Sequence, residues 1–286
     1  MDRSTSGFVN GLVGVLIFSG SLPATRLAVM ELDPVFLTVA RAAIAGALAS
    51  CLLIFFRERR PDRSDLLSLC LVSLGVVVGF PLLTALALKQ VTSAHSIVFV
   101  GLLPLATALF GVIRVGERPR PVFWLFSGLG SAVVVGFALS QGFSASLTGD
   151  LLMLAAILVC GFGYAEGASL SRKLGGWQVI SWALVLSLPV MIVLLIVTMP
   201  ATIAHSSAAS WLSLGYVSVF SMLVGFVFWY RGLAEGGIVA VGQLQLLQPF
   251  FGLALAAALL GEKVSWTILA ATFAIVACVA GARKFA

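Results

Sequence analysis

Residues 86–122 read LALKQVTSAHSIVFVGLLPLATALFGVIRVGERPRPV, and residues 231–267 repeat the pattern without a gap as RGLAEGGIVAVGQLQLLQPFFGLALAAALLGEKVSWT. The two stretches lie 145 positions apart, with these matches: Pro104 with Pro249, Gly116 and Glu117 with Gly261 and Glu262, and Arg118 with Lys263. Each copy predicts an apolar helix with a proline inside it, a tight turn, and a second apolar helix. The chain is therefore expected to be duplicated, with residues 1–145 and 146–286 as its two repeats.

Composition identifies the solvent around these helices. Hydrophobic residues make up 60% of the 286 residues and charged residues 10%, and the mean hydropathy is +1.13. A soluble domain is about 25% charged, so we predict an all-α integral membrane protein. A crossing helix needs about 20 apolar residues, and the chain divides into ten such stretches: 8–28, 34–56, 66–88, 93–113, 121–141, 149–171, 177–199, 211–230, 238–260 and 265–281.

The positions of lysine and arginine predict the orientation, because cytoplasmic loops carry the excess of both. With the N-terminus inside, thirteen cations fall on the cytoplasmic side: Arg3, Arg57, Arg59, Arg60, Arg63, Arg114, Arg118, Arg120, Arg172, Lys173, Arg231, Arg283 and Lys284. Arg26, Lys89 and Lys263 fall outside, and Arg41 alone is left inside a span. Both termini are therefore expected to be cytoplasmic. Each repeat then holds five spans and the second repeat is inverted, a leading architecture of small-solute transporters.

Topology also accounts for the net charge of +6, and no basic stripe interleaved with aromatic residues remains to bind a nucleic acid. The first stretch is expected to be a retained helix, because it is longer than the apolar region of a signal peptide. The four cysteines lie one each in four different stretches, without the spacing of metal ligands. We expect neither a metal nor another cofactor.

The ten-stretch layout, the run ALALKQVTSA at residues 85–94 and the doubled pattern of proline followed by Gly-Glu resemble the EamA-type branch of the drug/metabolite transporter superfamily. The resemblance covers nearly the whole chain. Within the branch, the chain is most similar to bacterial inner-membrane exporters of amino acids and related metabolites, the YddG type. This resemblance implies ten helices around a central cavity, with the fifth and tenth at the periphery.

Prolines inside the spans suggest where the chain moves. A proline in a membrane helix frees a backbone carbonyl, which is tolerated where neighbouring groups or cavity water satisfy it. Pro104 and Pro249 occupy corresponding positions, and paired interruptions point to the working site of a transporter. We expect them to act as hinges, with helix packing as the alternative. Glycines four residues apart predict close packing between helices: Gly7 with Gly11, Gly75 with Gly79, and Gly232 with Gly236.

Arg41 and Glu166 are the clearest charges inside the predicted spans, where a charge is costly enough to suggest a function. Arg41 either extends to the membrane surface, forms a structural ion pair, or serves a site. Glu166 either pairs with the nearby Arg172 or Lys173, or serves a site. Glu117, in its turn, is expected to bind backbone donors or cations.

Neutral polar and aromatic side chains supply the candidate substrate site. An aromatic ring offers an apolar face, while hydroxyl and amide groups offer hydrogen bonds. We predict that a central cavity is lined by Phe80, Thr84, Phe99, Tyr164, Gln245 and Gln248, a set that includes no strong charge. For each glutamine, bridging between two helices is the alternative.

The side chains that are missing narrow the substrate class. A carrier of phosphates or nucleotide sugars would need several cations at mid-membrane, and only Arg41 comes close. A zwitterion needs no net charge, because helix dipoles, amide donors and carbonyls freed by prolines can hold its two ends. The sequence favours export of neutral, apolar or aromatic amino acids by a lipid-embedded monomer of the bacterial inner membrane. Export of drugs or other metabolites is the alternative within the superfamily.

An intramembrane enzyme or a channel is the rival class. Catalysis would need a nucleophile and a base, or a cluster of Asp, His and Glu, at one depth. His95 and Glu166 are isolated, His205 falls in a predicted outer loop, and no signature of a metalloprotease, a serine hydrolase or a phosphate-binding loop occurs. A channel would need a ring of charges or a filter repeat. Neither class is expected.

Overall fold

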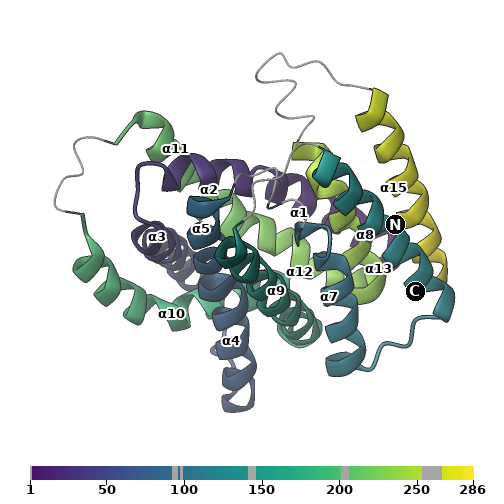
Figure 1. The fold of residues 1–286 in the computed structure, drawn as a ribbon. Helices are drawn as coiled ribbons and strands as arrows, with labels where there is room; N and C mark the ends of the chain where they lie inside the picture. The colour runs from purple at the N-terminus through teal and green to yellow at the C-terminus, as the bar shows by residue number, and fades with distance from the viewer. Residues whose placement is uncertain (1, 92–95, 97–98, 141–145, 201–205, 253–265) are drawn as a thin grey trace.

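The computed structural model describes residues 2–91, 96, 99–140, 146–200, 206–252 and 266–286. Within these ranges the regular structure is helical, without a strand, so the all-α prediction is confirmed (Figure 1). The helices are α1 (Arg3–Ser19), α2 (Ser21–Val29), α3 (Pro34–Phe55), η1 (Arg63–Asp65), α4 (Leu66–Val72), η2 (Ser73–Gly79), α5 (Phe80–Gln90), α7 (Leu103–Phe110), η3 (Gly111–Val115), α8 (Pro121–Ser140), α9 (Leu147–Leu174), α10 (Gly176–Thr198), α11 (Ala208–Tyr216), η4 (Val217–Val224), α12 (Gly225–Gly236), α13 (Ile238–Gly242), η5 (Gln243–Leu247) and α15 (Trp266–Phe285).

Several helical stretches in the described residues match a bilayer. Six have the length and apolar composition to cross it: Arg3–Val29, Pro34–Phe55, Arg63–Gln90, Leu147–Leu174, Gly176–Thr198 and Ala208–Gly236. Shorter apolar helices occupy Leu103–Val115, Pro121–Gly136 and Ile238–Gly252. Their order agrees with the predicted spans. The total of ten crossings stays a prediction, because parts of the fourth and ninth predicted spans lie outside the described residues.

Two of the long stretches contain a π-helical segment at the same place in each predicted repeat. From here on, a repeat means one of these two predicted ranges, residues 1–145 or 146–286. η2 ends at Gly79 and η4 ends at Val224, which are 145 positions apart. π-helical turns are rare and often mark functional sites. The stretch around η4 contains no proline, so the search for prolines in the sequence did not find this irregularity.

The first stretch is interrupted at Gly20, between α1 and α2, which the sequence did not predict. The Tyr216 hydroxyl donates a hydrogen bond of 2.5 Å to the Ile17 carbonyl. A Cβ atom at Gly20 would lie 2.5 Å from the same hydroxyl oxygen. A tyrosine of the second repeat therefore satisfies a carbonyl beside the interruption, and only glycine leaves room for it.

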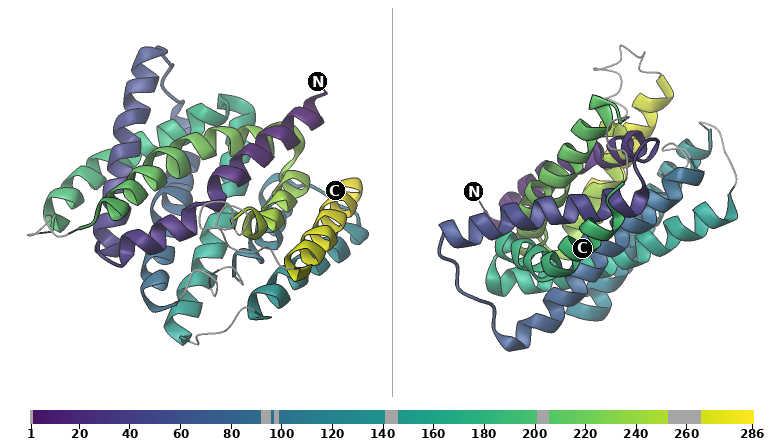
Figure 2. Two further views of the ribbon diagram at one scale, coloured as in Figure 1. Left: turned by 90° about the horizontal axis from the view of Figure 1, so that it is seen from above. Right: turned by 90° about the vertical axis from the view of Figure 1, so that its left-hand side faces the viewer.

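Helices of the two repeats pack against each other in pairs: α1 with α12, α3 with α10, α5 with α9, and α8 with α15 (Figure 2). Glycines allow the closest contacts. A Cβ atom at Gly7 would lie 2.4 Å from the Gly236 nitrogen, and one at Gly232 would lie 2.6 Å from the Gly11 nitrogen. The prediction that these glycines form packing surfaces is confirmed, because any larger side chain would hold the backbones apart.

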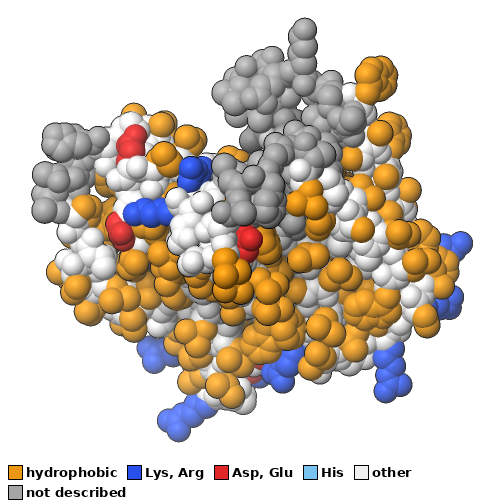
Figure 3. Space-filling model, in the orientation of Figure 1, with side chains coloured by type: hydrophobic (Ala, Val, Ile, Leu, Met, Phe, Trp, Pro, Cys, Tyr) orange, Lys and Arg blue, Asp and Glu red, His pale blue; other side chains and the backbone are white. Residues whose placement is uncertain are grey.

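The surface and the ends of the bundle fit a membrane protein. Hydrophobic side chains are spread widely over the face seen in Figure 3, and basic side chains lie along its lower margin. Both termini lie at one end: the Ser6 hydroxyl donates to the Glu235 carboxylate at 2.7 Å, and the Arg120 nitrogen donates to the Phe285 carbonyl at 2.9 Å. We call this end the termini end. The end that carries Glu31 is the opposite end.

The pair α8 and α15 lies at one edge of the bundle (Figure 1). This is the peripheral position that the family resemblance implied for the fifth and tenth helices. The other paired helices therefore surround the interior of the bundle.

Candidate functional site

A small cavity lies between the two repeats, and we call it the central cavity. It is lined by Phe18, Ser21, Leu22, Thr25, Arg41, Val76, Phe80, Pro81, Thr84, Val100, Leu103, Tyr164, Ser221, Phe226 and Gln248. Its volume is about 30 Å³, which holds about two water molecules. A pocket that encloses a ligand measures about 300 Å³ or more. The central cavity in this structure is therefore smaller than a pocket that encloses a metabolite.

Arg41 brings a positive charge into the central cavity. The Asp33 carboxylate caps the start of α3, and Arg41 follows about two turns later. Its side chain is 6% exposed. The Nη2 atom lies 3.4 Å from the Ser221 hydroxyl oxygen, while the Nε atom has no hydrogen-bond partner. No ion pair between described residues involves Arg41.

Two serines connect the repeats beside this arginine. The Ser21 hydroxyl on α2 donates to the Ser221 hydroxyl on η4 at 2.6 Å. Ser221 belongs to the π-helical segment, so the irregular turn presents its hydroxyl to both Ser21 and Arg41. Elements α2, α3 and η4 thus meet at one polar point of an otherwise largely apolar wall.

Aromatic rings form another part of the wall. The ring of Phe226 lies 5.1 Å from that of Phe18 and 5.9 Å from that of Tyr164, measured between centroids. One turn further along α12, Trp229 and Tyr230 are fully buried. The Tyr230 hydroxyl donates to the Gly163 carbonyl at 3.1 Å. These two large side chains fill the space between the cavity and the termini end.

The structure brings together some of the predicted substrate-binding residues: Phe80, Thr84, Tyr164 and Gln248 all line the central cavity. The Thr84 hydroxyl donates to the Phe80 carbonyl at 2.7 Å. The Gln248 amide nitrogen donates to the Phe18 carbonyl at 3.3 Å. The hydrogen-bond donors of both side chains are thus directed to backbone carbonyls.

Phe99 and Gln245 are not among the described residues that line the cavity. The Gln245 amide nitrogen lies 3.4 Å from the Thr107 hydroxyl oxygen and donates to the Gly242 carbonyl at 3.2 Å. This contact joins η5 to α7, which is the bridging that the sequence left open as an alternative. The roles of all six residues in substrate binding stay a prediction.

Arg41 also lines the cavity, although the predicted set of lining residues includes no charge. The sequence carried a signal, since Arg41 is the one cation that the topology leaves inside a span. Its burial shows that it does not extend to the surface, and within the described residues it forms no structural ion pair. The absence of a partner depends on the fold, so the sequence did not show it.

The two predicted hinge prolines each follow an irregular segment. Pro104 lies in the first turn of α7, after a turn at residues 101–102. Pro249 follows the 3-10 helix η5. A proline in the first turn of a helix removes no needed hydrogen bond. Action as hinges stays a prediction, and residues 253–265, which include the second Gly-Glu turn, lie outside the described residues, as do His95 and His205.

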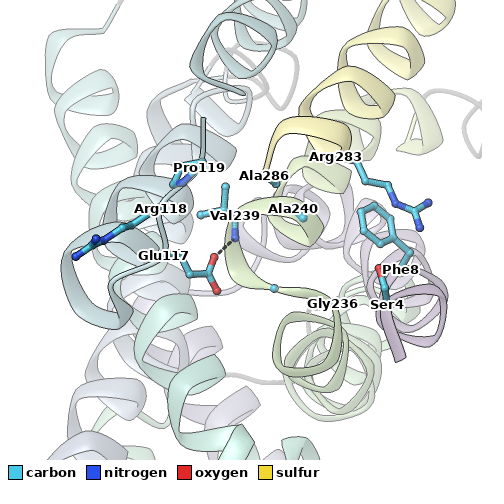
Figure 4. A pocket seen from close by; sticks show the side chains of 11 residues that line it. Ser4, Phe8, Glu117, Arg118, Pro119, Gly236, Val239, Ala240, Arg283 and Ala286 are labelled. Carbon is cyan, nitrogen blue, oxygen red and sulfur yellow. Dashed lines mark hydrogen bonds between the residues drawn. The ribbon is translucent and has the colours of Figure 1, made fainter. Parts of the chain in front are cut away.

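Glu117 joins the two repeats at the termini end (Figure 4). It follows Gly116, whose φ of 75° ends η3 in the left-handed region that favours glycine. Its carboxylate accepts hydrogen bonds from the backbone nitrogens of Ile238 at 3.1 Å and Val239 at 2.8 Å. It also pairs with Arg172 at 2.8 Å. The expectation that Glu117 binds backbone donors and a cation is confirmed.

A hollow of about 390 Å³ lies beside Glu117 and is lined by Ser4, Phe8, Glu117, Arg118, Pro119, Gly236, Gly237, Val239, Ala240, Arg283 and Ala286. It is larger than the central cavity, but its walls come from the ends of helices and their links (Figure 4). Arg283 lies over the Phe8 ring, 4.0 Å from its centroid. The hollow is therefore a depression at the end of the bundle rather than a site between spans.

Further ion pairs join the repeats near the termini end. The Arg114 Nε and Nη2 atoms donate to the two oxygens of Glu166 at 2.8 and 3.1 Å. Lys173 pairs with Asp65 at 2.7 Å and Asp62 at 3.1 Å. Of the readings left open for Glu166, the ion pair is the one observed, with Arg114 in place of the nearby Arg172 or Lys173.

At the opposite end, Glu31 holds the start of α11. Its carboxylate accepts from the Ser207 backbone nitrogen at 2.6 Å and from the Ser210 hydroxyl at 2.9 Å. These bonds, led by the one from the Ser207 backbone, lower the pKa of Glu31 from its usual value of 4.5. Both ends of the bundle thus carry contacts between repeats. In the described part of the chain, no group of three or more His, Cys, Asp or Glu side chains is arranged to hold a metal.

Apolar helices of membrane length, packed in pairs around a cavity, define a class of protein: a multi-pass helical membrane protein with an internal site. The profile of the EamA-like transporter family matches residues 5–139 and again residues 147–283. The chain belongs to this family of membrane transporters.

Relatives agree with this assignment. The chain is 66% identical over 286 residues to "Uncharacterized transporter YdeK" of Bacillus subtilis (strain 168), with full coverage of both proteins. It is 26% identical over 259 residues, 87% of each protein, to an "Uncharacterized transporter" of Archaeoglobus fulgidus. A solved structure described only as "Crystal structure of protein" matches the whole of both chains with a TM-score of 0.81 at 20% identity, which shows the fold alone. None of these names states a substrate.

Proposed function

We propose that the protein exports small metabolites, foremost apolar and aromatic amino acids, by alternating access across the bacterial inner membrane. The supporting observation is the central cavity, whose wall combines aromatic rings with hydroxyl, amide and guanidinium groups. Such a wall suits a small molecule with an apolar body and a few polar groups. Export of other metabolites is the alternative, and membership of the family is compatible with both.

The proposed architecture is ten crossing helices in two inverted five-helix repeats. The π-helical segments η2 and η4 support it, since they end at corresponding positions. The packing supports it too. α1 and α12 belong to the first and eighth predicted spans, whose counterparts in the other repeat are the sixth and third spans. These counterparts contain α9 and α5, which also pack against each other. The contacts of α3 with α10 and of α8 with α15 each join a span to its own counterpart.

Alternating access requires that contacts at one end break while those at the other form. Opening the termini end would release Glu117 from the start of α13 and displace Trp229 and Tyr230 from beneath the cavity. Pro104 and Pro249, each next to an irregular segment, are the proposed hinges. Wild-type transport by the Pro104→Ala, Pro249→Ala double variant would assign both prolines to packing.

Flux measurements test the proposal. Purified protein in proteoliposomes should carry labelled phenylalanine or leucine in a saturable manner, and unlabelled analogues should compete. Empty liposomes provide the control. The absence of saturable flux for every amino acid, together with flux of another metabolite class, would replace the amino-acid proposal with the alternative. A chemically altered product would instead indicate an enzyme.

A further inference from the structure

Three charged side chains are buried in the described part of the chain: Arg41, Asp65 and Glu166. Asp65 and Glu166 each have a cation within 2.8 Å. Arg41 has a single contact of 3.4 Å to a neutral hydroxyl, and its Nε atom has no partner. A buried charge without a partner is strongly unfavourable, so the surroundings of Arg41 favour an incoming negative charge.

We propose that Arg41 is a carboxylate-binding residue of the central cavity, so that the transported molecule is a small organic carboxylate. This inference rests on the proposed transport function and narrows its substrate class. A guanidinium group binds a carboxylate through two parallel hydrogen bonds. The Nε and Nη2 atoms form one edge of that group. On Arg41, this edge has a free Nε atom and only the weak contact of Nη2 with Ser221.

The protein itself shows the geometry that this edge adopts. Arg114 uses its Nε and Nη2 atoms to bind both oxygens of Glu166, at 2.8 and 3.1 Å. Arg41 presents the same pair of atoms in the cavity without a protein carboxylate. A substrate carboxylate would occupy the place that Glu166 takes on Arg114, with the hydroxyls of Ser21 and Ser221 as adjacent hydrogen-bonding groups.

The rest of the cavity wall indicates that the substrate does not need an ammonium group. The described lining contains no aspartate or glutamate, so no fixed negative charge there recognises an ammonium group. The rings of Phe18, Tyr164 and Phe226 offer an apolar surface for the remainder of the molecule. The carboxylate is therefore required and the amine is dispensable, whereas a phosphate ester would call for more than one cation.

Binding to the purified protein in nanodiscs tests this inference without any transport assay. The probes are phenylalanine, 3-phenylpropionate, which lacks the amine, and phenethylamine, which lacks the carboxylate. We expect the first two to bind with similar affinity and phenethylamine to bind at least tenfold more weakly. Equal binding of phenethylamine and 3-phenylpropionate, or failure of all three probes and of a wider panel of monocarboxylates to bind, would overturn the inference.

Variants then connect the selectivity to Arg41. Arg41→Gln should weaken carboxylate binding at least about 30-fold. This value is the lower end of the range expected when one member of a buried, hydrogen-bonded charge pair is removed. Arg41→Lys should retain part of the affinity. Arg63→Gln, an exposed arginine of η1, is the matched control and should leave binding unchanged. Full carboxylate affinity in a folded Arg41→Gln protein would refute the assignment. If that variant does not fold, the comparison of the three probes on the wild-type protein is the deciding test.

Flux and binding separate the two proposals. Binding of carboxylates that depends on Arg41, without flux of any of them in proteoliposomes, would reject transport and keep the carboxylate site. Saturable flux that does not discriminate amines from carboxylates would keep transport and reject the carboxylate site.

Discussion

Glu166 and Arg41 are both buried charges on membrane-length helices, yet their surroundings differ. Glu166 receives two hydrogen bonds from Arg114, whereas the Arg41 Nε atom has no partner. The first charge therefore stabilises contact between the repeats. The second lies in a cavity, where an external molecule can supply the missing charge. A buried charge that the protein pairs and one that it leaves unpaired carry different information about function.

The same contrast extends to the regions around them. The region between the cavity and the termini end is filled by Trp229 and Tyr230, and there the backbones of α1 and α12 meet at glycines. Around the cavity, the chain instead contains an interruption at Gly20 and two π-helical segments. Irregular backbone within a membrane protein is tolerated where protein buries it or where it lines a cavity. One region is thus closely packed, and the other contains irregular backbone beside a cavity.

The prediction with the largest expected effect concerns which end of the bundle faces the cytoplasm. In a background without native cysteines, Ser64→Cys at the termini end should resist an impermeant thiol reagent applied to intact cells. Ser206→Cys at the opposite end should react, because the distribution of cations predicts that this end faces outside. Both should react after the membrane is permeabilised, which is the control. Labelling of Ser64→Cys in intact cells would reverse the orientation.

Close packing at the termini end makes a second prediction. A Cβ atom at Gly232 would lie 2.6 Å from the Gly11 nitrogen, so Gly232→Ala must push α12 away from α1. We expect it to destabilise the protein by about 1–3 kcal/mol, measured by thermal unfolding in detergent. Gly215→Ala, on α11, is the control, because a Cβ atom there meets no atom within 4 Å. If the two variants were equally stable, the close contact between α1 and α12 would not contribute to the stability of the termini end.

The contacts of Glu117 should influence which end is open. Glu117→Gln removes the charge that binds Arg172 and weakens the hydrogen bonds to the start of α13. A loss of about 1–3 kcal/mol should raise the labelling rate of a single cysteine at Ala240 about tenfold. Glu31→Gln, at the opposite end, should leave that rate unchanged or lower it. A rise of equal size in both variants would indicate general loosening rather than a contact specific to one end.

The smallest effect concerns pH at the opposite end. The pKa of Glu31 is lowered in the folded protein, so its hydrogen bonds contribute stability above the usual value of 4.5, and this contribution is lost as the pH falls through the lowered pKa. Labelling of Ser206→Cys by an acid-tolerant thiol reagent should therefore speed up modestly below pH 4.5. Adding Glu31→Gln should remove that pH dependence. A pH dependence that persists in the double variant would assign it to another group.

The sequence by itself determined that this is an α-helical membrane protein with a repeated pattern. Apolar runs of about 20 residues, loop cations and a spacing of 145 positions are properties of the linear chain. Glycine spacing likewise predicted that α1 and α12 each carry a close-packing face, since four-residue intervals bring small residues onto one side of a helix. Phe80 and Thr84 could be grouped beside Pro81 for the same reason.

Only the tertiary structure decided which side chains from distant helices meet. It directed Gln245 toward Thr107 rather than into the cavity, paired Glu166 with Arg114, and formed a π-helical segment at η4 where the sequence contains no proline. It also left Arg41 buried without a carboxylate. The sequence shows that a charge lies inside a span, but its partner is set by packing between helices that are far apart along the chain.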